Sequence, residues 1–322
     1  MNWLAWRHRL EYLVFRAIES VVLMLSPARA RELAENLAFV FHRVLPRKLT
    51  RYDVAQENLR QALGADTPDA VIDEHIRGMW VHCFRLVIEI VQLRRKVRED
   101  NFLDIVQYGL GRQACWRAFN TGRPVMLVGG HFGNWEIANT LFGLWGFPLG
   151  VVARDLDNPY LHAWFKSFRE HTGHRLFSKE GASEQMLPLL ARRGHVALLC
   201  DQDAGPRGLF IDFFGKPAST FKSIALVALE HRALICVGGA LRLPDNFRRD
   251  DTVGPPWSKF EIVCEEVIDP ETIDGSDPVG EITRRYTAAL ERLIRRAPEQ
   301  YFWVHRRWKS VPQQRRAARK AA

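Results

Sequence analysis

The chain has 322 residues, of which 47% are hydrophobic and 26% charged, and its 46 lysines and arginines exceed its 37 acidic residues to give a net charge of +9. These proportions allow a sizeable folded core and exclude a disordered or collagen-like chain. The basic surface suits an anionic partner such as phospholipid, nucleic acid or a phosphorylated molecule, and charge alone does not choose among them.

Cysteine usage bears on the cellular compartment and on metals. The number of cysteines is odd, none forms a CxxC pair, and all stand in or beside apolar stretches. This pattern argues against a disulfide framework or a zinc site and predicts reduced, buried thiols in a cytosol-facing protein. We therefore expect no metal. The cysteines are Cys83, Cys115, Cys200, Cys236 and Cys264.

Residues 1–110 are predicted to be helical and to form a membrane-associating region. The apolar stretch 12–25 is interrupted by charged residues and is short for a bilayer span, which needs roughly 20 mostly apolar residues. Aromatic residues such as Trp3 and Trp6, mixed with arginines, are instead typical of a helix lying in the membrane interface. The alternative is an amphipathic helix of the core. Further helices are predicted over 28–44, 54–63 and 68–93.

From about residue 111 the pattern alternates between short β-rich runs and helical segments. This alternation predicts an α/β domain over 111–312 with a largely parallel central sheet flanked by helices. A basic tail without acidic residues follows over 313–322. The predicted strands are 125–128, 149–153, 196–200, 234–243 and 260–267, and the predicted helices are 135–144, 160–171, 182–193, 221–231 and 279–296.

The segment 124–136, PVMLVGGHFGNWE, is the strongest candidate for a catalytic site. An apolar strand leads into a glycine pair, after which His131 and Glu136 follow five residues apart. We expect His131 on the loop and Glu136 in the first helical turn, where the carboxylate orients the imidazole and leaves its other nitrogen free as a base. No nucleophilic serine accompanies them, so the nucleophile would come from the substrate.

Polar residues also follow two other predicted strands, Arg154 after one and Asp201 after another. Because ligands bind beyond the carboxyl ends of parallel strands, we expect both to lie near His131. Arg154 suits a phosphate or an oxyanion. Asp201 would anchor Arg154 or a loop, or act as a second carboxylate on His131. Backbone N–H groups near Gly130 and Asn134 are further candidates to stabilise an oxyanion.

Four ordered blocks over about 111–312 carry a family resemblance. GGHFGNWE resembles the His-x4-acid block of glycerolipid acyltransferases, in the glutamate form of the lipid A late acyltransferases (lauroyl and myristoyl transferases). The segment 153–159, ARDLDNP, is similar to the family's arginine and Asn-Pro segment, and 201–207, DQDAGPR, resembles its DQD-x-GPR block. The segment 298–309, PEQYFWVHRRWK, resembles the C-terminal PEQ-x-x-W-x-HRR-x-K signature.

The resemblance implies transfer of an acyl chain from an acyl carrier protein or CoA thioester to a hydroxyl of a membrane glycolipid, at the cytoplasmic face of the inner membrane. His131 would be the general base and Glu136 its partner; the thioester is a co-substrate, and no cofactor is implied. Peripheral attachment and a single N-terminal anchor both stay open. Further substrate-binding candidates are Asn158, which equally suits a helix cap, and Arg207, Arg306 and Arg307, which suit headgroup phosphates or structural salt bridges.

Three alternatives remain at this point. In the first, the acceptor is another glycolipid or a lysophospholipid. In the second, the chain is a non-catalytic basic module on membranes or nucleic acid. In the third, water replaces the acceptor, as in a thioesterase. No nucleic-acid-binding motif is present, so we expect no nucleic-acid partner, and no G-x-S-x-G elbow supports a hydrolase. Two interpretations are open for the phenylalanines at 210, 213, 214 and 221: they line an acyl tunnel, or they belong to the hydrophobic core.

Overall fold

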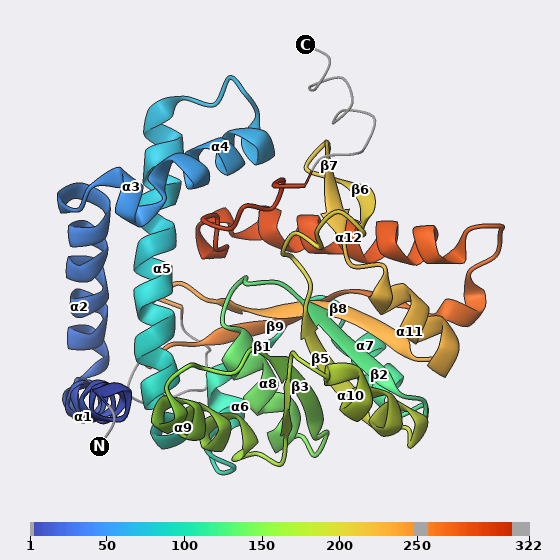
Figure 1. Cartoon of the computed structure of the whole chain (residues 1–322), viewed down its shortest axis with the longest axis horizontal. Coiled ribbons are helices and arrows are strands. Elements are labelled where there is room, and N and C mark those ends of the chain that lie inside the picture. Colours follow the sequence, from blue (N-terminus) through green and yellow to red (C-terminus); the bar gives the residue numbers. More distant parts are fainter. Residues whose placement is uncertain (1–2, 248–256, 311–322) are drawn as a thin grey trace.

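The computed structural model describes residues 3–247 and 257–310. It is built on a seven-stranded sheet of order β1-β9-β8-β2-β5-β3-β4 (Figure 1). β9 runs antiparallel to β8, and the other neighbouring strands are parallel. The predicted α/β class with a largely parallel sheet flanked by helices is therefore confirmed. The strands are β1 (Val106–Tyr108), β2 (Val125–Gly129), β3 (Leu149–Ala153), β4 (Arg175–Ser178), β5 (His195–Leu199), β8 (Leu234–Arg242) and β9 (Phe260–Ile268).

Helices cover both faces of the sheet, with α11 and α12 on one face and α7 and α8 on the other (Figure 1). Coverage on both faces explains why β2, and β8 as far as Leu241, carry no alternating polar residues. The helices are α1 (Trp3–Met24), α2 (Pro27–Phe39), α3 (Arg47–Thr50), α4 (Tyr52–Leu63), α5 (Asp69–Lys96), α6 (Phe102–Ile105), α7 (Arg112–Phe119), α8 (Trp135–Leu144), α9 (Pro159–Glu170), α10 (Ala182–Ala191), α11 (Ser223–His231) and α12 (Pro278–Arg296), with a π-helix at Val40–Val44 and 3-10 turns at Pro270–Thr272 and Pro298–Gln300 (η3).

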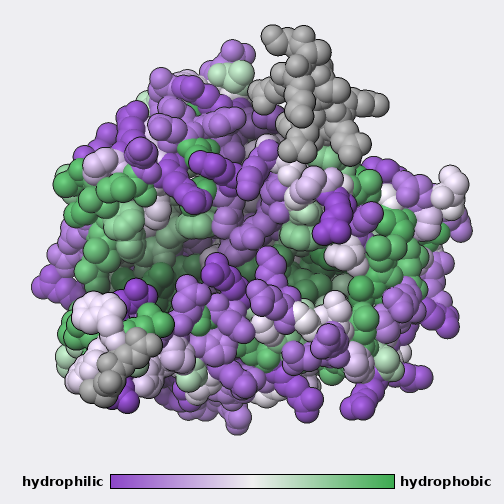
Figure 2. All heavy atoms as spheres, viewed as in Figure 1, coloured by the Kyte–Doolittle hydropathy of each residue, from purple (hydrophilic) through white to green (hydrophobic). Residues whose placement is uncertain are grey.

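The N-terminal helices pack beside the sheet, with α5 between α2 and the α/β part (Figure 1). α1 buries little of its surface. Figure 2 shows apolar side chains gathered over α2 and α5, on the left of the view. Among the helices of the described residues, none combines the length and apolarity that crossing a bilayer requires. The exposed apolar residues of α1 are Trp3, Leu4, Trp6, Leu10, Leu13, Val14, Ile18, Val21 and Met24.

Some elements differ from the sequence-based prediction. The sheet begins with β1, a few residues before the predicted boundary at 111, and the short edge strand β4 was not predicted. A hairpin of β6 (Leu209–Phe213) and β7 (Lys216–Thr220) follows β5. Phe213 and Phe214 at its turn are buried against Trp303 and Trp308, so they belong to the core and line no tunnel. The predicted basic tail lies outside the described residues.

Candidate active site

His131 and Asp201 meet at the carboxyl edge of the sheet. His131 follows β2 and Asp201 follows β5, and these strands are parallel neighbours, so their ends open at the same edge. The two residues share two contacts: His131 Nδ1 lies 2.9 Å from Asp201 Oδ1, and the His131 backbone N–H donates to Oδ2 at 2.8 Å. With Nδ1–H donating to the carboxylate, the ring is held in one orientation and Nε2 keeps its lone pair.

A glycine permits this close approach. Gly130 stands between β2 and His131, and a Cβ added there would lie 3.1 Å from the Cβ and Cγ of Asp201. Any larger residue would push the carboxylate away from the imidazole, so the second glycine of the pair fixes how near the two groups can lie. Asp201 is almost fully buried, and about a fifth of the His131 side chain is exposed to solvent.

Burial and the neighbouring charges have opposite effects on the pKa values of His131 and Asp201. Burial alone lowers the pKa of His131, but the negative charge of Asp201, its hydrogen bond and the charge of Glu136 together raise it above the ordinary value. Burial alone raises the pKa of Asp201, yet His131 and the neighbouring His305 lower it to about 2. The buried carboxylate of Asp201 therefore stabilises a positive charge on the imidazole of His131.

Glu136 does not contact the imidazole in the way that the sequence predicted. It lies in the first turn of α8, as expected, but its carboxylate accepts hydrogen bonds from Arg169 of α9, including one of 2.6 Å to Nη2. The carboxylate on the ring nitrogen is that of Asp201. The reason is geometric, because Nδ1 faces the end of β5 whereas α8 directs Glu136 toward α9, and Glu136 acts on His131 through its charge.

Two aromatic rings complete the surroundings of His131. Trp135 packs edge-on against it at 5.1 Å between centroids, and His305 lies at 4.7 Å on another side. Burial and the nearby His131 charge lower the pKa of His305 to about 4, so it is neutral near neutral pH. The C-terminal segment that carries His305 is tied to the same loop, because the Phe302 N–H donates to the His131 carbonyl at 3.0 Å.

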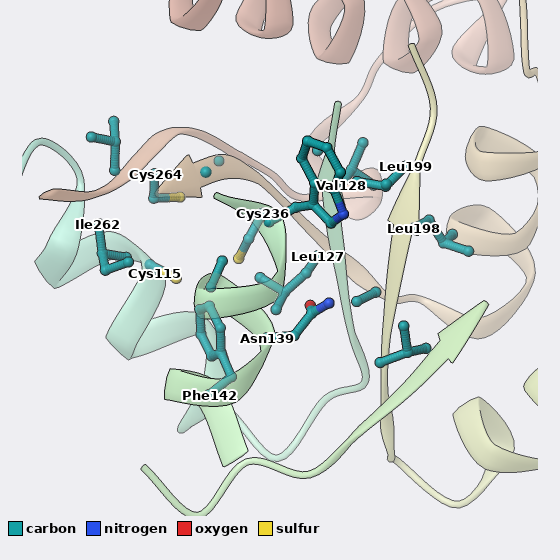
Figure 3. Close-up of a pocket in the computed structure, with 18 of the residues that line it drawn as sticks. Cys115, Leu127, Val128, Asn139, Phe142, Leu198, Leu199, Cys236, Ile262 and Cys264 are labelled. Carbon is teal, nitrogen blue, oxygen red and sulfur yellow. The ribbon is translucent and has the colours of Figure 1, made fainter. Parts of the chain in front are cut away.

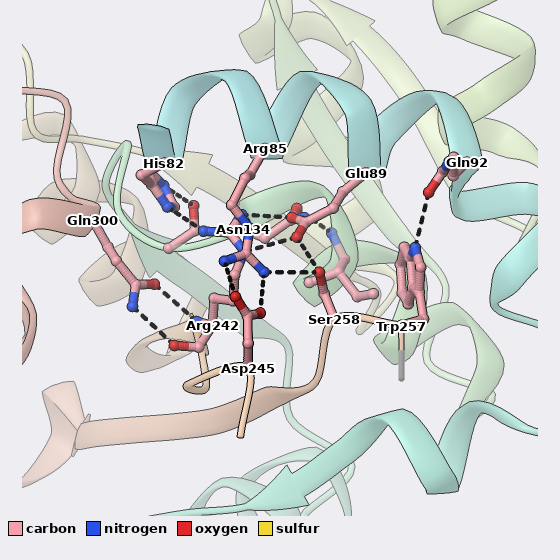
Figure 4. A network of polar contacts seen from close by, with 12 residues as sticks. His82, Arg85, Glu89, Gln92, Asn134, Arg242, Asp245, Trp257, Ser258 and Gln300 are labelled. Carbon is pink, nitrogen blue, oxygen red and sulfur yellow. Dashed lines mark hydrogen bonds and ion pairs between the residues drawn. The ribbon is translucent and has the colours of Figure 1, made fainter. Parts of the chain in front are cut away.

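A buried polar network holds the loop after β2 in place (Figure 4). Asn134 caps α8 through the Ile137 N–H and donates to Glu89 of α5 at 2.9 Å. Glu89 forms a two-bond ion pair with Arg242 of β8, with distances of 2.7 and 2.6 Å. A further bond runs from the backbone N–H of Gly133 to the carbonyl of Gln300, at 2.9 Å. Three elements far apart in sequence thus fix the position of His131.

An apolar pocket opens beside the catalytic candidates, between the sheet and helices α7 and α8 (Figure 3). Its empty volume is about 1150 Å³, including the space at its opening to solvent. Gly129 and Gly130 form part of its wall, as do Trp135 and the Glu136–Arg169 pair, so a few polar groups lie in a mostly hydrophobic lining. A pocket of this size and character suits an extended apolar chain.

Comparison with known proteins identifies the family of the chain. The profile of the family described as bacterial lipid A biosynthesis acyltransferase matches residues 4–310, nearly the whole chain. The chain belongs to this family. The predicted resemblance is confirmed, and it extends further toward the N-terminus than the four blocks over 111–312 indicated.

Curated relatives of the chain are acyltransferases of two kinds. A phosphatidylinositol mannoside acyltransferase of Mycolicibacterium smegmatis is 26% identical over 194 residues, which cover 56% of this chain and 60% of the relative. The lipid A biosynthesis lauroyltransferase of Escherichia coli is 26% identical over 193 residues, covering 59% of this chain and 58% of the relative. The lipid A biosynthesis palmitoleoyltransferase of E. coli is also 26% identical, over a segment that covers 61% of this chain and 59% of the relative. The matched segments thus span less than two thirds of these relatives.

The remaining predicted site residues of this family member lie apart from His131 or are engaged elsewhere. Arg154 is directed to solvent, with 80% of its side chain exposed and Asp157 as its partner. Asn158 is buried and ties α9 to α1, because it caps α9 and donates to the His8 carbonyl and to Glu11. These contacts correct the expectation that strand-end position alone would bring Arg154 to the site, and they favour the capping role of Asn158.

The C-terminal arginines of the family signature divide into two environments. Arg307 is buried and donates to the Ser219 carbonyl and the Thr220 hydroxyl, so its contacts are structural. Arg306 and Arg207 are exposed and stay candidates for headgroup contact. The Asn134 N–H is already bound to the Ala240 carbonyl at 2.7 Å, which excludes it as an oxyanion donor in this conformation. The role of the Gly130 N–H as an oxyanion donor stays a prediction.

Several features of the site escaped the sequence reasoning. Arg169 lies inside a helix without any local motif, and only the three-dimensional packing brings it to Glu136. The segment of His305 was predicted to contact headgroup phosphates or the membrane interface, and no sequence pattern indicated that its ring packs against His131. The cysteines lack CxxC spacing and were predicted to be reduced, buried thiols without a metal site; three of them, from α7, β8 and β9, converge in the pocket wall.

Proposed function

We propose that this protein transfers a fatty acyl chain from an acyl thioester to a hydroxyl group of a lipid A-type glycolipid. The observation that carries the proposal is a histidine on a buried carboxylate, beside an apolar pocket, in a member of this acyltransferase family. The pocket supplies a place for the acyl chain, and His131 supplies the base that the acceptor hydroxyl needs.

The reaction proceeds by direct attack of the acceptor. His131 Nε2 removes the hydroxyl proton while the oxygen attacks the thioester carbonyl, and Asp201 stabilises the imidazolium that forms. Collapse of the tetrahedral intermediate breaks the carbon–sulfur bond, and the imidazolium returns its proton to the leaving thiolate. The Glu136–Arg169 pair lines the pocket, and the negative charge of the Glu136 carboxylate contributes to the raised pKa of His131. The N–H of Gly130 is a candidate donor to the oxyanion.

The donor and the membrane contact form part of the same proposal. Acyl carrier protein and CoA are the two thioester carriers to be compared. The exposed apolar residues of α1 suit a peripheral position on the cytoplasmic face of the inner membrane. Exposed Arg207 and Arg306 suit the phosphates of a glycolipid headgroup.

A second acceptor is supported by a specific observation. The phosphatidylinositol mannoside acyltransferase is as similar to this chain as the lauroyltransferase, at 26% identity each. A mannosylated phosphatidylinositol is therefore the alternative acceptor. It shares with lipid A a sugar hydroxyl beside anionic phosphate, so the catalytic residues would act in the same way on both.

The test is acyl transfer by the purified full chain in detergent. Each donor is combined with a lipid A precursor, a phosphatidylinositol mannoside and a lysophospholipid, and products are identified by mass. We expect an added acyl group on one glycolipid, lost in His131→Ala and retained in His75→Ala, a control on α5. Thioester cleavage without acylated product would indicate a thioesterase instead. Equal product from wild type and His131→Ala would remove His131 from the mechanism.

A further inference from the structure

Three cysteines from three different elements meet in the wall of the apolar pocket. Cys115 lies on α7, Cys236 on β8 and Cys264 on β9, and their Sγ atoms all lie within 4.8 Å of one another. Figure 3 shows the three sulfur atoms turned toward one another at one end of the pocket. Cys236 and Cys264 are buried, whereas Cys115 is partly exposed, so the group is reached from the pocket.

The backbone around the cysteines holds this arrangement rigidly. The Cys264 N–H donates to the Leu110 carbonyl at 2.9 Å, which fixes the start of α7 directly on β9. Gly111, with φ of +74°, caps α7 so closely that a Cβ there would lie 1.8 Å from the Cys264 carbonyl oxygen. One helical turn later, Cys115 necessarily faces Cys264. A site whose ligands are held by backbone contacts needs little rearrangement to bind an ion.

We propose that the Cys115–Cys236–Cys264 cluster binds a soft metal ion in trigonal thiolate coordination, with Cu(I) as the chemical class that fits. Thiolates are the ligands that soft ions select. Three sulfurs bound at about 2.3 Å to one central ion lie about 4 Å from one another. The three Sγ atoms here lie within 4.8 Å of one another, so small side-chain rotations are enough to reach that spacing. Within the described residues, no histidine, aspartate or glutamate joins these three cysteines in the group, so the four protein ligands of a closed structural zinc site are not present.

A basic side chain in the pocket wall favours an anionic thiolate cluster. Arg112, three residues before Cys115 on the same helix, lines the same pocket and contributes a positive charge. Uptake of Cu(I) replaces the thiol protons, which pass to solvent. This proposal stands apart from the acyl-transfer proposal, because binding is measured without substrate.

The test is competition for Cu(I) with a chromogenic chelator, under reducing and oxygen-free conditions, using the full chain. We expect one ion per chain in the wild type and at least a hundredfold loss of affinity when any one of the three is replaced, as in Cys115→Ser. Cys83→Ser is the matched control, since Cys83 lies outside the group. X-ray absorption should give three sulfur neighbours. Circular dichroism verifies that each variant is folded.

A second measurement keeps the proposal falsifiable if a serine variant unfolds. Alkylation of the wild type by iodoacetamide, followed by mass mapping, should show Cys115, the partly exposed member of the cluster, protected by bound Cu(I), with Cys83 unchanged. Equal Cu(I) uptake by the wild type and the folded triple serine variant would overturn the proposal. Zinc binding as tight as that of Cu(I) would overturn the trigonal assignment, and loss of Cu(I) binding in Cys83→Ser would place the ion elsewhere.

Discussion

At the scale of single residues, the site is determined by which carboxylate touches the imidazole. His131 was predictable because a glycine pair after an apolar strand is a recognisable local pattern. Its partner was not, because Asp201 is distant in sequence and the two residues meet only through the pairing of β2 with β5. The sequence placed Asp201 at a strand end but left its role open, and local spacing favoured Glu136.

Replacing the two carboxylates separately tests this assignment. We expect Asp201→Asn to lower kcat by about 10³–10⁴-fold, because the amide can no longer hold the correct tautomer. Glu136→Gln should cost at least about tenfold less, since Glu136 contacts Arg169 rather than the ring. Steady-state kinetics on folded variants provides the comparison. The reverse order of losses would return the orienting role to Glu136.

The pH profile provides a second test at this scale. His131 acts as a base only when neutral, and its raised pKa means that kcat/KM falls as pH drops through a value above the usual 6.5 or so. Glu136→Gln removes one of the charges that raise this pKa, so its acidic limb should move to lower pH. Measuring kcat/KM from acid to neutral pH shows the shift. An acidic limb that does not move would separate Glu136 from the titration of His131.

At the scale of elements, the sequence predicted the long helices and the central strands well, because their apolar patterns are strong. β2, β8, β9 and α12 begin and end within about two residues of the expected positions. Short edge strands such as β1 and β4 carry too few residues for a pattern, and they form because a neighbouring strand offers hydrogen-bonding groups. Contacts between elements, such as α5 against the His131 loop, have no local signal at all.

The α5 network makes a stability prediction. Glu89→Ala leaves the buried guanidinium of Arg242 unpaired and removes the partner of Asn134, so we expect a loss of about 3–5 kcal/mol in the free energy of unfolding. Arg77→Ala, which breaks an exposed pair with Glu74 on the same helix, should cost about 1 kcal/mol or less. Urea unfolding of both variants measures the difference. Equal losses would mean that the buried network contributes no more than a surface pair.

At the scale of the whole molecule, one flank of the protein is unusually apolar. The N-terminal helix packs on α9 and α5 through a few contacts, such as that of Phe15 with Trp164, and leaves most of its apolar side chains exposed. The sequence predicted this amphipathic character from aromatic and basic residues in alternation. Exposed apolar side chains gathered on one helix are typical of a surface that contacts a membrane or a protein.

Binding to lipid vesicles tests the role of this flank. Leu10 and Leu13 are 63% and 64% exposed, and burying such side chains in a bilayer stabilises binding by about 1.5–3 kcal/mol each. Replacing both by glutamate should therefore weaken binding to phosphatidylglycerol vesicles by more than about tenfold. Val71→Glu on α5, also at an exposed apolar position, is the control. Sedimentation with vesicles gives the affinities, and unaltered binding by the double variant would exclude this flank.

The contacts between residues 300–305 and the His131 loop also carry a consequence for biosynthesis. Phe132 pairs with Tyr301, Gly133 with Gln300, and Phe302 with His131, so the loop is completed by a segment that the ribosome makes long after it. A nascent chain that has already formed β2 still lacks these contacts. The ordered position of His131 is therefore complete only when translation has passed the last of these residues.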